Sequence, residues 1–150
     1  MFFDGLAREF RFVLDVAASK ENRKAPDYLG LDADDPKRRD ALAVSWRSAL
    51  DGIEGTWRGV ACWMNPPYSR GLQGKFIAKA AAERLEGVTT VALLPARTDT
   101  KTFHAHIYDI ATWQPREGVE IRLIKGRLKF GGAANSAPFP SMVVIFRGRA

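Results

Sequence analysis

The residues of this sequence best suited to chemistry are Asn65-Pro66-Pro67-Tyr68, which directly follow the apolar run 60–64. An apolar run that ends at prolines predicts a buried strand that empties into a loop. Open α/β sheets bind their ligands at that end of a strand. The prolines lack a backbone N–H and fix φ, so the loop presents carbonyl acceptors, to which Asn65 adds an amide oxygen and Tyr68 an aromatic face. Such a loop is suited to holding a planar base by its amino group.

The Asn-Pro-Pro-Tyr motif resembles the active-site signature of amino-methyltransferases that use S-adenosylmethionine, and this resemblance implies group transfer to an exocyclic amine. The lone pair of such an amine is delocalised into the ring, which makes the nitrogen a weak nucleophile. The Asn65 side chain and the Pro66 carbonyl would accept its two hydrogens and aim the lone pair, so that catalysis rests on positioning and electrostatics. Tyr68 would stack on a base rotated out of the duplex, for about 1–3 kcal/mol. The alternative is a rigid turn, because Asn and Pro are ordinary loop residues.

Length and composition predict one soluble globular domain. The chain has 150 residues, of which 46% are hydrophobic and 27% charged. It has neither an apolar stretch near the roughly 20 residues of a membrane span nor a signal peptide, so we expect a cytoplasmic protein. The single cysteine, Cys62, excludes an internal disulfide and is expected in the core, and no Cys/His cluster offers a metal site.

The charge of the chain suits a polyanionic partner. Its 23 basic and 17 acidic residues give a net charge of +6. Three basic residues lie close together at Lys125, Arg127 and Lys129, which makes them candidates for contacts with nucleic-acid phosphates. The alternative for each of them is an ordinary solvated surface residue.

The hydrophobic pattern predicts alternating helices and strands early in the chain and consecutive strands at its end. Helices are expected at 2–10, 74–85 and 98–110. Strands are expected at 12–16, 59–64, 90–94, 120–125, 127–130 and 142–147. Residues 17–58 are expected to be irregular, with short helical pieces near 36–50. This order predicts an α/β fold with a mostly parallel sheet and an antiparallel C-terminal edge.

Five ordered sequence blocks resemble the phage-type DNA N-6-adenine methyltransferase family, often called Dam-like. They are found at residues 14–22, 65–69, 94–100, 126–132 and 135–141. The resemblance implies a Rossmann-like methyltransferase sheet, S-adenosylmethionine as the cofactor, and DNA as the partner. The implied product is adenine methylated on its exocyclic amine, with Asn65, Pro66, Pro67 and Tyr68 as the catalytic residues.

The same resemblance assigns cofactor and DNA contacts to individual residues. Asp15 matches a position at the methionine end of the cofactor, where a carboxylate can pair with the ammonium; its alternative is a helix N-cap. The other cofactor candidates are Ala17, Asn22, Asp40 and Asn65. Arg97 and Asp99 follow the strand 90–94 and are candidates for contacts with the base or a phosphate, although Thr98 or Asp99 would also cap the next helix. The remaining DNA-binding candidates are Ser69, Arg70, Lys125, Arg127, Lys129, Asn135 and Ser136.

Two features separate this chain from the pattern of larger relatives. Family members commonly begin earlier, with a Thr-Pro segment and a helix that complete the cofactor pocket, so we expect that segment to be missing here. A chain of 150 residues also leaves no space for a target-recognition domain, so recognition has to come from loops, from a homodimer, or be loose. The alternatives are methylation of protein glutamine, RNA bases or cytosine, and a non-catalytic remnant that binds nucleic acid.

Overall fold

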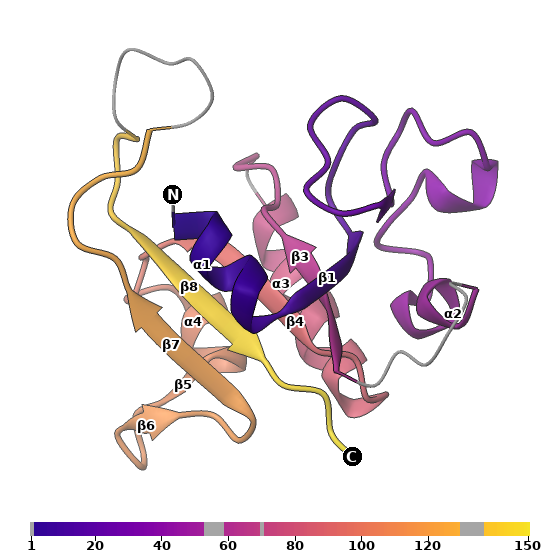
Figure 1. Ribbon diagram of the computed structural model, residues 1–150. Helices are drawn as coiled ribbons and strands as arrows, with labels where there is room; N and C mark the ends of the chain where they lie inside the picture. Colours follow the sequence, from indigo (N-terminus) through magenta and orange to yellow (C-terminus); the bar gives the residue numbers. More distant parts are fainter. Residues whose placement is uncertain (1, 53–58, 70, 130–136) are drawn as a thin grey trace.

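A mixed six-stranded sheet lies at the centre of the computed structural model, which describes residues 2–52, 59–69, 71–129 and 137–150 (Figure 1). The strand order is β2-β1-β3-β4-β8-β7. The strands are β1 (Arg11–Asp15), β2 (Asp27–Tyr28), β3 (Val60–Met64), β4 (Thr90–Pro95), β7 (Val119–Leu123) and β8 (Ser141–Phe146). Pairing is parallel from β2 to β4, and β8 is antiparallel to both of its neighbours. The predicted α/β class with a mostly parallel sheet is confirmed, with β8 inside the sheet and β7 at its edge.

Helices cover both faces of this sheet. They are α1 (Phe2–Glu9), α2 (Trp46–Asp51), α3 (Leu72–Leu85) and α4 (Lys101–His106), and Pro36–Arg38 form a short 3-10 helix. Figure 1 shows α1 in front of the sheet, with α3 and α4 behind it. Side chains alternate between the two faces of a strand, so the sheet carries two hydrophobic clusters. Leu6, Phe12 and Trp63 belong to the cluster beneath α1, whereas Phe76 and Phe103 belong to the cluster beneath α3 and α4.

The cysteine occupies the predicted core position. Cys62 is fully buried in β3, within the cluster beneath α3 and α4. Burial raises the pKa of its thiol, which keeps the sulfur protonated at neutral pH. Cys62 is therefore a small packing residue.

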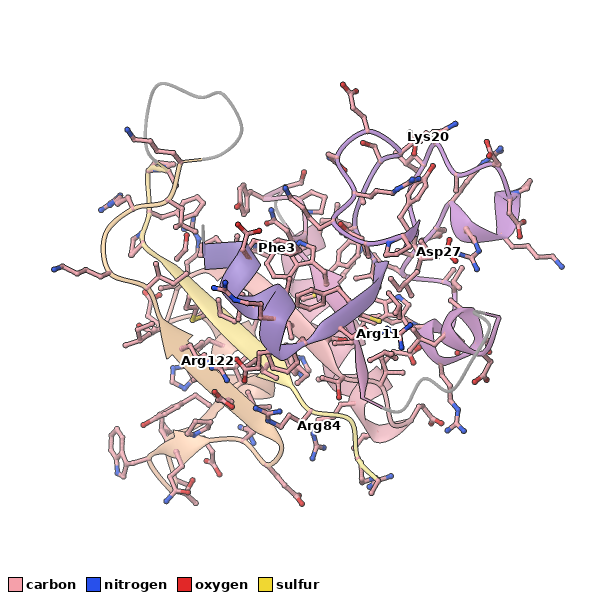
Figure 2. The ribbon with its side chains drawn as sticks, viewed as in Figure 1. Phe3, Arg11, Lys20, Asp27, Arg84 and Arg122 are labelled. Carbon is pink, nitrogen blue, oxygen red and sulfur yellow. The ribbon has the colours of Figure 1, made fainter. Side chains whose placement is uncertain are left out.

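Ion pairs fasten α1 to the far edge of the sheet, and we call this group the α1 clamp. The Arg122 guanidinium on β7 donates to both carboxylate oxygens of Glu9, at 2.6 and 2.7 Å, beside the end of α1 (Figure 2). Glu120 accepts from Arg122 and, at 2.7 Å, from Arg147. The hydrogen bonds from Arg122 lower the pKa of both Glu9 and Glu120.

Two predicted elements are corrected by the structure. The helix predicted at 98–110 ends at His106, and a hairpin of β5 (Tyr108–Asp109) and β6 (Gln114–Pro115) follows. The Arg116 backbone N–H and side chain donate to the carbonyls of Ile107 and His104, so the returning strand satisfies the end of the helix. The predicted strand at 127–130 is wrong for its described residues 127–129. Gly126, with φ at 78°, turns the chain after β7, and the Leu128 carbonyl accepts from the Ala137 N–H at 2.7 Å instead of from a strand of the sheet.

Candidate active site

The Asn-Pro-Pro-Tyr motif begins where β3 ends, between its parallel neighbours β1 and β4. Asn65 is half-buried and Pro66 is buried, whereas Pro67 and Tyr68 are exposed. The rigid prolines thus carry the chain out of the sheet at its carboxyl edge, where the segments that follow β1 and β4 also emerge. This is the predicted position for a ligand site.

A first cavity, of about 480 Å³, lies between the segment that follows β1 and the beginning of α3. Three predicted cofactor residues, Ala17, Asn22 and Asp40, line it together with Pro67 of the motif. Its other lining residues combine apolar side chains with further charged ones: Val16, Leu29, Leu42, Phe76, Asp32 and Arg39. Segments far apart in the sequence therefore form one pocket beside the motif.

Hydrogen bonds hold the loop after β1, which forms one wall of the first cavity. The Asn22 side-chain oxygen accepts from the Ser19 backbone N–H at 2.7 Å, and the Ser19 hydroxyl accepts from the Asn22 N–H at 3.2 Å. The Asp32 carboxylate accepts from the Lys20 N–H, at 3.0 Å for its nearer oxygen. Each of these bonds joins a side chain to the backbone, so the wall has a defined shape without belonging to a helix or strand.

Gly30 allows the two chain segments that form this wall to approach closely. A Cβ at this position would lie 1.7 Å from the Ala18 carbonyl oxygen, far inside van der Waals contact. The Ala18 N–H in turn donates to the Leu29 carbonyl at 3.1 Å. Any larger residue at position 30 would therefore push apart the segments that line the cavity.

Asp15 lies behind the wall of the first cavity, and its residue is only 2% exposed. One carboxylate oxygen accepts from the Ala17 N–H at 3.2 Å and the other from the Lys24 N–H at 2.9 Å. Burial raises the pKa of Asp15, and the two N–H donors oppose that rise. No helix begins in the described residues directly after Asp15, so the alternative N-cap role is wrong. In this structure the carboxylate orients the loop that carries Ala17.

A second cavity, of about 710 Å³, lies on the other side of the motif, between α3 and α4. Tyr68 lines it, together with Ser69 and Arg97, two of the predicted DNA-binding residues. Its walls also include apolar residues of α3, of α4 and the position directly after it, and of β8: Ile77, Ala78, Phe103, Ile107 and Met142. The cavity therefore combines an aromatic ring and cationic groups with an apolar interior.

Phe139 is a candidate site residue that the sequence reasoning missed. Its ring contacts Tyr68 edge to face, with the ring centroids 5.1 Å apart, and the Arg97 guanidinium lies 5.7 Å from its centroid. Burial raises the pKa of the Tyr68 hydroxyl, which stays protonated at neutral pH. A phenylalanine between Pro138 and Pro140 was the available signal, because prolines on both sides limit where the ring can point.

The other predicted DNA-binding residues occupy the surface. Asp99 is exposed, and the cap of α4 is Thr100, whose hydroxyl accepts from the Phe103 N–H at 3.2 Å. The predicted cap at Thr98 or Asp99 is therefore wrong by one or two residues. Lys125, Arg127 and Lys129 are all exposed on the segment that follows β7. Arg70, Asn135 and Ser136 lie outside the described residues.

Metal-ligand groups and membrane-spanning helices are both absent from the part of the chain that the structure describes. Within the described ranges, no group of three or more His, Cys, Asp or Glu side chains is arranged to hold a metal ion. None of the described helices has the length and apolar character needed to cross a membrane.

Comparison with known proteins identifies the family. No match was found among curated proteins or among solved structures. A family model described as DNA N-6-adenine-methyltransferase (Dam) matches residues 1–149, almost the whole chain, which includes the motif and both cavities. The chain therefore belongs to the DNA N-6-adenine-methyltransferase (Dam) family.

Proposed function

We propose that this chain transfers a methyl group from S-adenosylmethionine to the exocyclic amine of adenine in DNA, on a Rossmann-like fold. The observation that carries the proposal is that the motif separates two cavities. Pro67 lines the first cavity and Tyr68 lines the second. The first two residues of α3 are divided in the same way, because Leu72 lines the first cavity and Gln73 lines the second. A reaction between two substrates requires two pockets that meet at the reacting groups.

The first cavity fits the chemistry of the cofactor. S-adenosylmethionine carries an ammonium, a sulfonium and a carboxylate, and the cavity offers the carboxylates of Asp32 and Asp40 and the guanidinium of Arg39. Leu29 and Phe76 provide apolar surface for its adenine ring. Gly30 lets the Ala18 backbone pack against it, which holds together the wall of this cavity. When bound, the cofactor supplies an electrophilic methyl group.

The residues of the motif then prepare the acceptor. The Asn65 amide oxygen and the Pro66 carbonyl accept the two hydrogens of the amine, which draws the nitrogen towards tetrahedral geometry and orients its lone pair. Among the residues described around the second cavity there is no Asp, Glu or His. The proposed catalysis therefore depends on positioning and hydrogen bonding. The amine nitrogen would bond to the methyl carbon as the bond from that carbon to sulfur breaks, S-adenosylhomocysteine would leave, and the proton lost by the amine would pass to solvent water.

Basic residues around the second cavity support DNA as the acceptor. Lys75 and Arg97 line the cavity and are exposed, and Lys125, Arg127 and Lys129 are exposed beyond β7. Together with the net charge of +6, these groups suit phosphate contacts that weaken as salt increases. The aromatic rings of Tyr68 and Phe139 favour a planar base over a protein glutamine side chain.

The experiment that tests the function supplies three acceptors separately, with S-adenosylmethionine carrying an isotopic label in its methyl group. The acceptors are unmethylated duplex DNA, RNA of matched composition and a glutamine-containing protein. We expect label in DNA only, with an initial rate that falls as salt is raised. Label in RNA or protein but not in DNA would overturn the choice of acceptor, and binding of DNA without any transfer would support a non-catalytic protein.

A further inference from the structure

Gln73 has the only side chain on either cavity whose buried polar atom lacks a partner among the residues that the structure describes. Five described residues carry such an atom: Gln73, Arg84, Thr90, His104 and Ser141. Of these, only Gln73 lines either of the two cavities beside the motif, and it lines the second one. The atom is the side-chain amide nitrogen, a donor of two hydrogen bonds.

An enclosed donor without an acceptor is unfavourable, and native proteins satisfy nearly all such groups. Gln73 is the second residue of α3, whose N-cap is Gly71, and it follows shortly after the motif in the sequence. Its side chain has three rotatable bonds, so a small rotation can present the amide to a molecule in the cavity. The missing partner is therefore expected to arrive with the ligand.

The shape and chemistry of the cavity define the acceptor that this amide would meet. A Cβ at Gly74 would lie 3.1 Å from the Thr102 hydroxyl, so α3 and α4 approach closely beside Gln73. A space between close helices, with Tyr68 on its wall, suits a flat aromatic ring. Adenine offers ring nitrogens as acceptors in addition to the amine, which the proposed mechanism already assigns to Asn65 and Pro66.

We propose that Gln73 positions and selects the acceptor base by donating a hydrogen bond from its side-chain amide to a ring nitrogen of adenine in the second cavity. This inference rests on the proposed function and extends it to base selection. Asn65 and Pro66 hold the amine that reacts, and Gln73 holds the ring itself at one of its nitrogens. A ring held at both places cannot rotate away from the methyl donor.

The test replaces both the donor and its acceptor. Wild type, Gln73→Leu and Gln73→Glu are assayed on random-sequence duplexes whose adenines are all normal, 1-deaza, 3-deaza or 7-deaza. Gln73→Glu keeps the size of the side chain and replaces the donor with an acceptor. The matched control is Gln114→Leu, which changes the only other glutamine, an exposed residue of β6. Circular dichroism and cofactor binding report on folding and on the first cavity.

We expect both Gln73 variants to have kcat/KM on normal DNA reduced about tenfold, the usual effect of leaving one hydrogen bond unmade in a site. Wild type should lose a similar factor on one deaza analogue, and Gln73→Leu should lose nothing further on that analogue. The inference is overturned if Gln73→Leu matches wild type, or if its losses on the analogues equal those of wild type. A wild-type chain that methylates no DNA would instead refute the proposed function, and this inference with it.

Discussion

The two cavities beside the motif are built in different ways. The wall of the first is a loop held by backbone N–H groups that donate to the side chains of Asp15, Asn22 and Asp32. The second lies between two helices, and it contains the unpartnered amide of Gln73 and the exposed ring of Tyr68. The hydrogen bonds of the first wall are thus made within the chain, whereas the second cavity has a donor for which we propose a partner on the ligand.

This difference matches the two roles that we propose. A cofactor pocket has to be occupied before each reaction and benefits from a wall whose shape is fixed in advance. A pocket for a base leaving a duplex has to admit and release that base, and the enzyme has to offset the cost of unstacking. The predictions below separate the motif, each cavity and a region outside both, from the largest expected effect to the smallest.

The largest effect is expected at the motif itself. Replacing Asn65→Ala removes an acceptor for the reacting amine, and removal of one such group typically lowers kcat by about 100- to 1,000-fold. Binding of S-adenosylmethionine, measured by calorimetry, should be nearly unchanged because Asn65 does not line the first cavity. Equal losses of binding and transfer would show that Asn65 supports the cofactor pocket instead.

A substitution at Gly30 should damage the first cavity alone. The new Cβ of Gly30→Ala would overlap the Ala18 carbonyl, and overpacking of this kind costs about 1–3 kcal/mol. We expect weaker cofactor binding and a lower free energy of unfolding, measured by calorimetry and by urea titration. Gly5→Ala is the matched control, because a Cβ there meets no atom within 4 Å. Normal cofactor affinity in Gly30→Ala would contradict the assignment of the pocket.

Asp15→Asn should have a smaller effect that depends on pH. Asparagine has one acceptor oxygen in place of two, so one of the N–H groups of Ala17 and Lys24 loses its partner, at about 1 kcal/mol. The raised pKa of Asp15 adds a second contribution, because ionising the buried carboxyl destabilises the folded wild type as pH rises through that pKa. The variant cannot ionise.

The measurable quantity is the free energy of unfolding of Asp15→Asn minus that of wild type. We expect this difference to increase from acid to neutral pH, as urea titrations at a series of pH values would show. Taking the difference between two chains cancels the other titrating groups. A difference that falls as pH rises would mean that the hydrogen bonds from Ala17 and Lys24 outweigh burial and stabilise the carboxylate on folding.

The smallest effect is expected at the α1 clamp, which contacts neither cavity. Arg122→Gln removes the hydrogen bonds that lower the pKa of Glu9 and Glu120, so a small stabilisation present at neutral pH is lost. Wild type loses the same stabilisation as pH falls through the lowered pKa values, so the two chains should converge in acid. Thermal unfolding at several pH values measures this, and methyl transfer by the folded variant should be unchanged.

The parts of the site encoded by local sequence were predictable, and the parts made by distant contacts were not. The strand before the motif and the loop after it follow from an apolar run that ends at two prolines. Ala17, Asn22 and Asp40 were candidates for one pocket through the family resemblance, and they line one cavity. The hydrogen bond that Asp15 accepts from the Lys24 N–H depends on where the chain returns, which no local pattern specifies.

Contacts with residues outside each local segment explain the other differences between the prediction and the structure. Residues 127–130 alternate as a strand does, but the Leu128 carbonyl accepts from the Ala137 N–H, a residue outside that segment. Gln73 and Phe139 gain their places from the arrangement of helices and loops around the second cavity, which no local pattern specifies. The apolar period at 98–110 does not reveal the hairpin, because Arg116 ends the helix from outside that segment.

The central claim is that the motif joins the two cavities in transfer to adenine. The most direct measurement incubates the chain with S-adenosylmethionine carrying a trideuterated methyl group and with unmethylated DNA, then identifies the nucleosides by mass spectrometry. Wild type should yield trideuterated N6-methyladenine, and Asn65→Ala should yield little or none while still binding the cofactor. The account is contradicted if the heavy methyl group appears on cytosine instead, or if Asn65→Ala forms the product as fast as wild type.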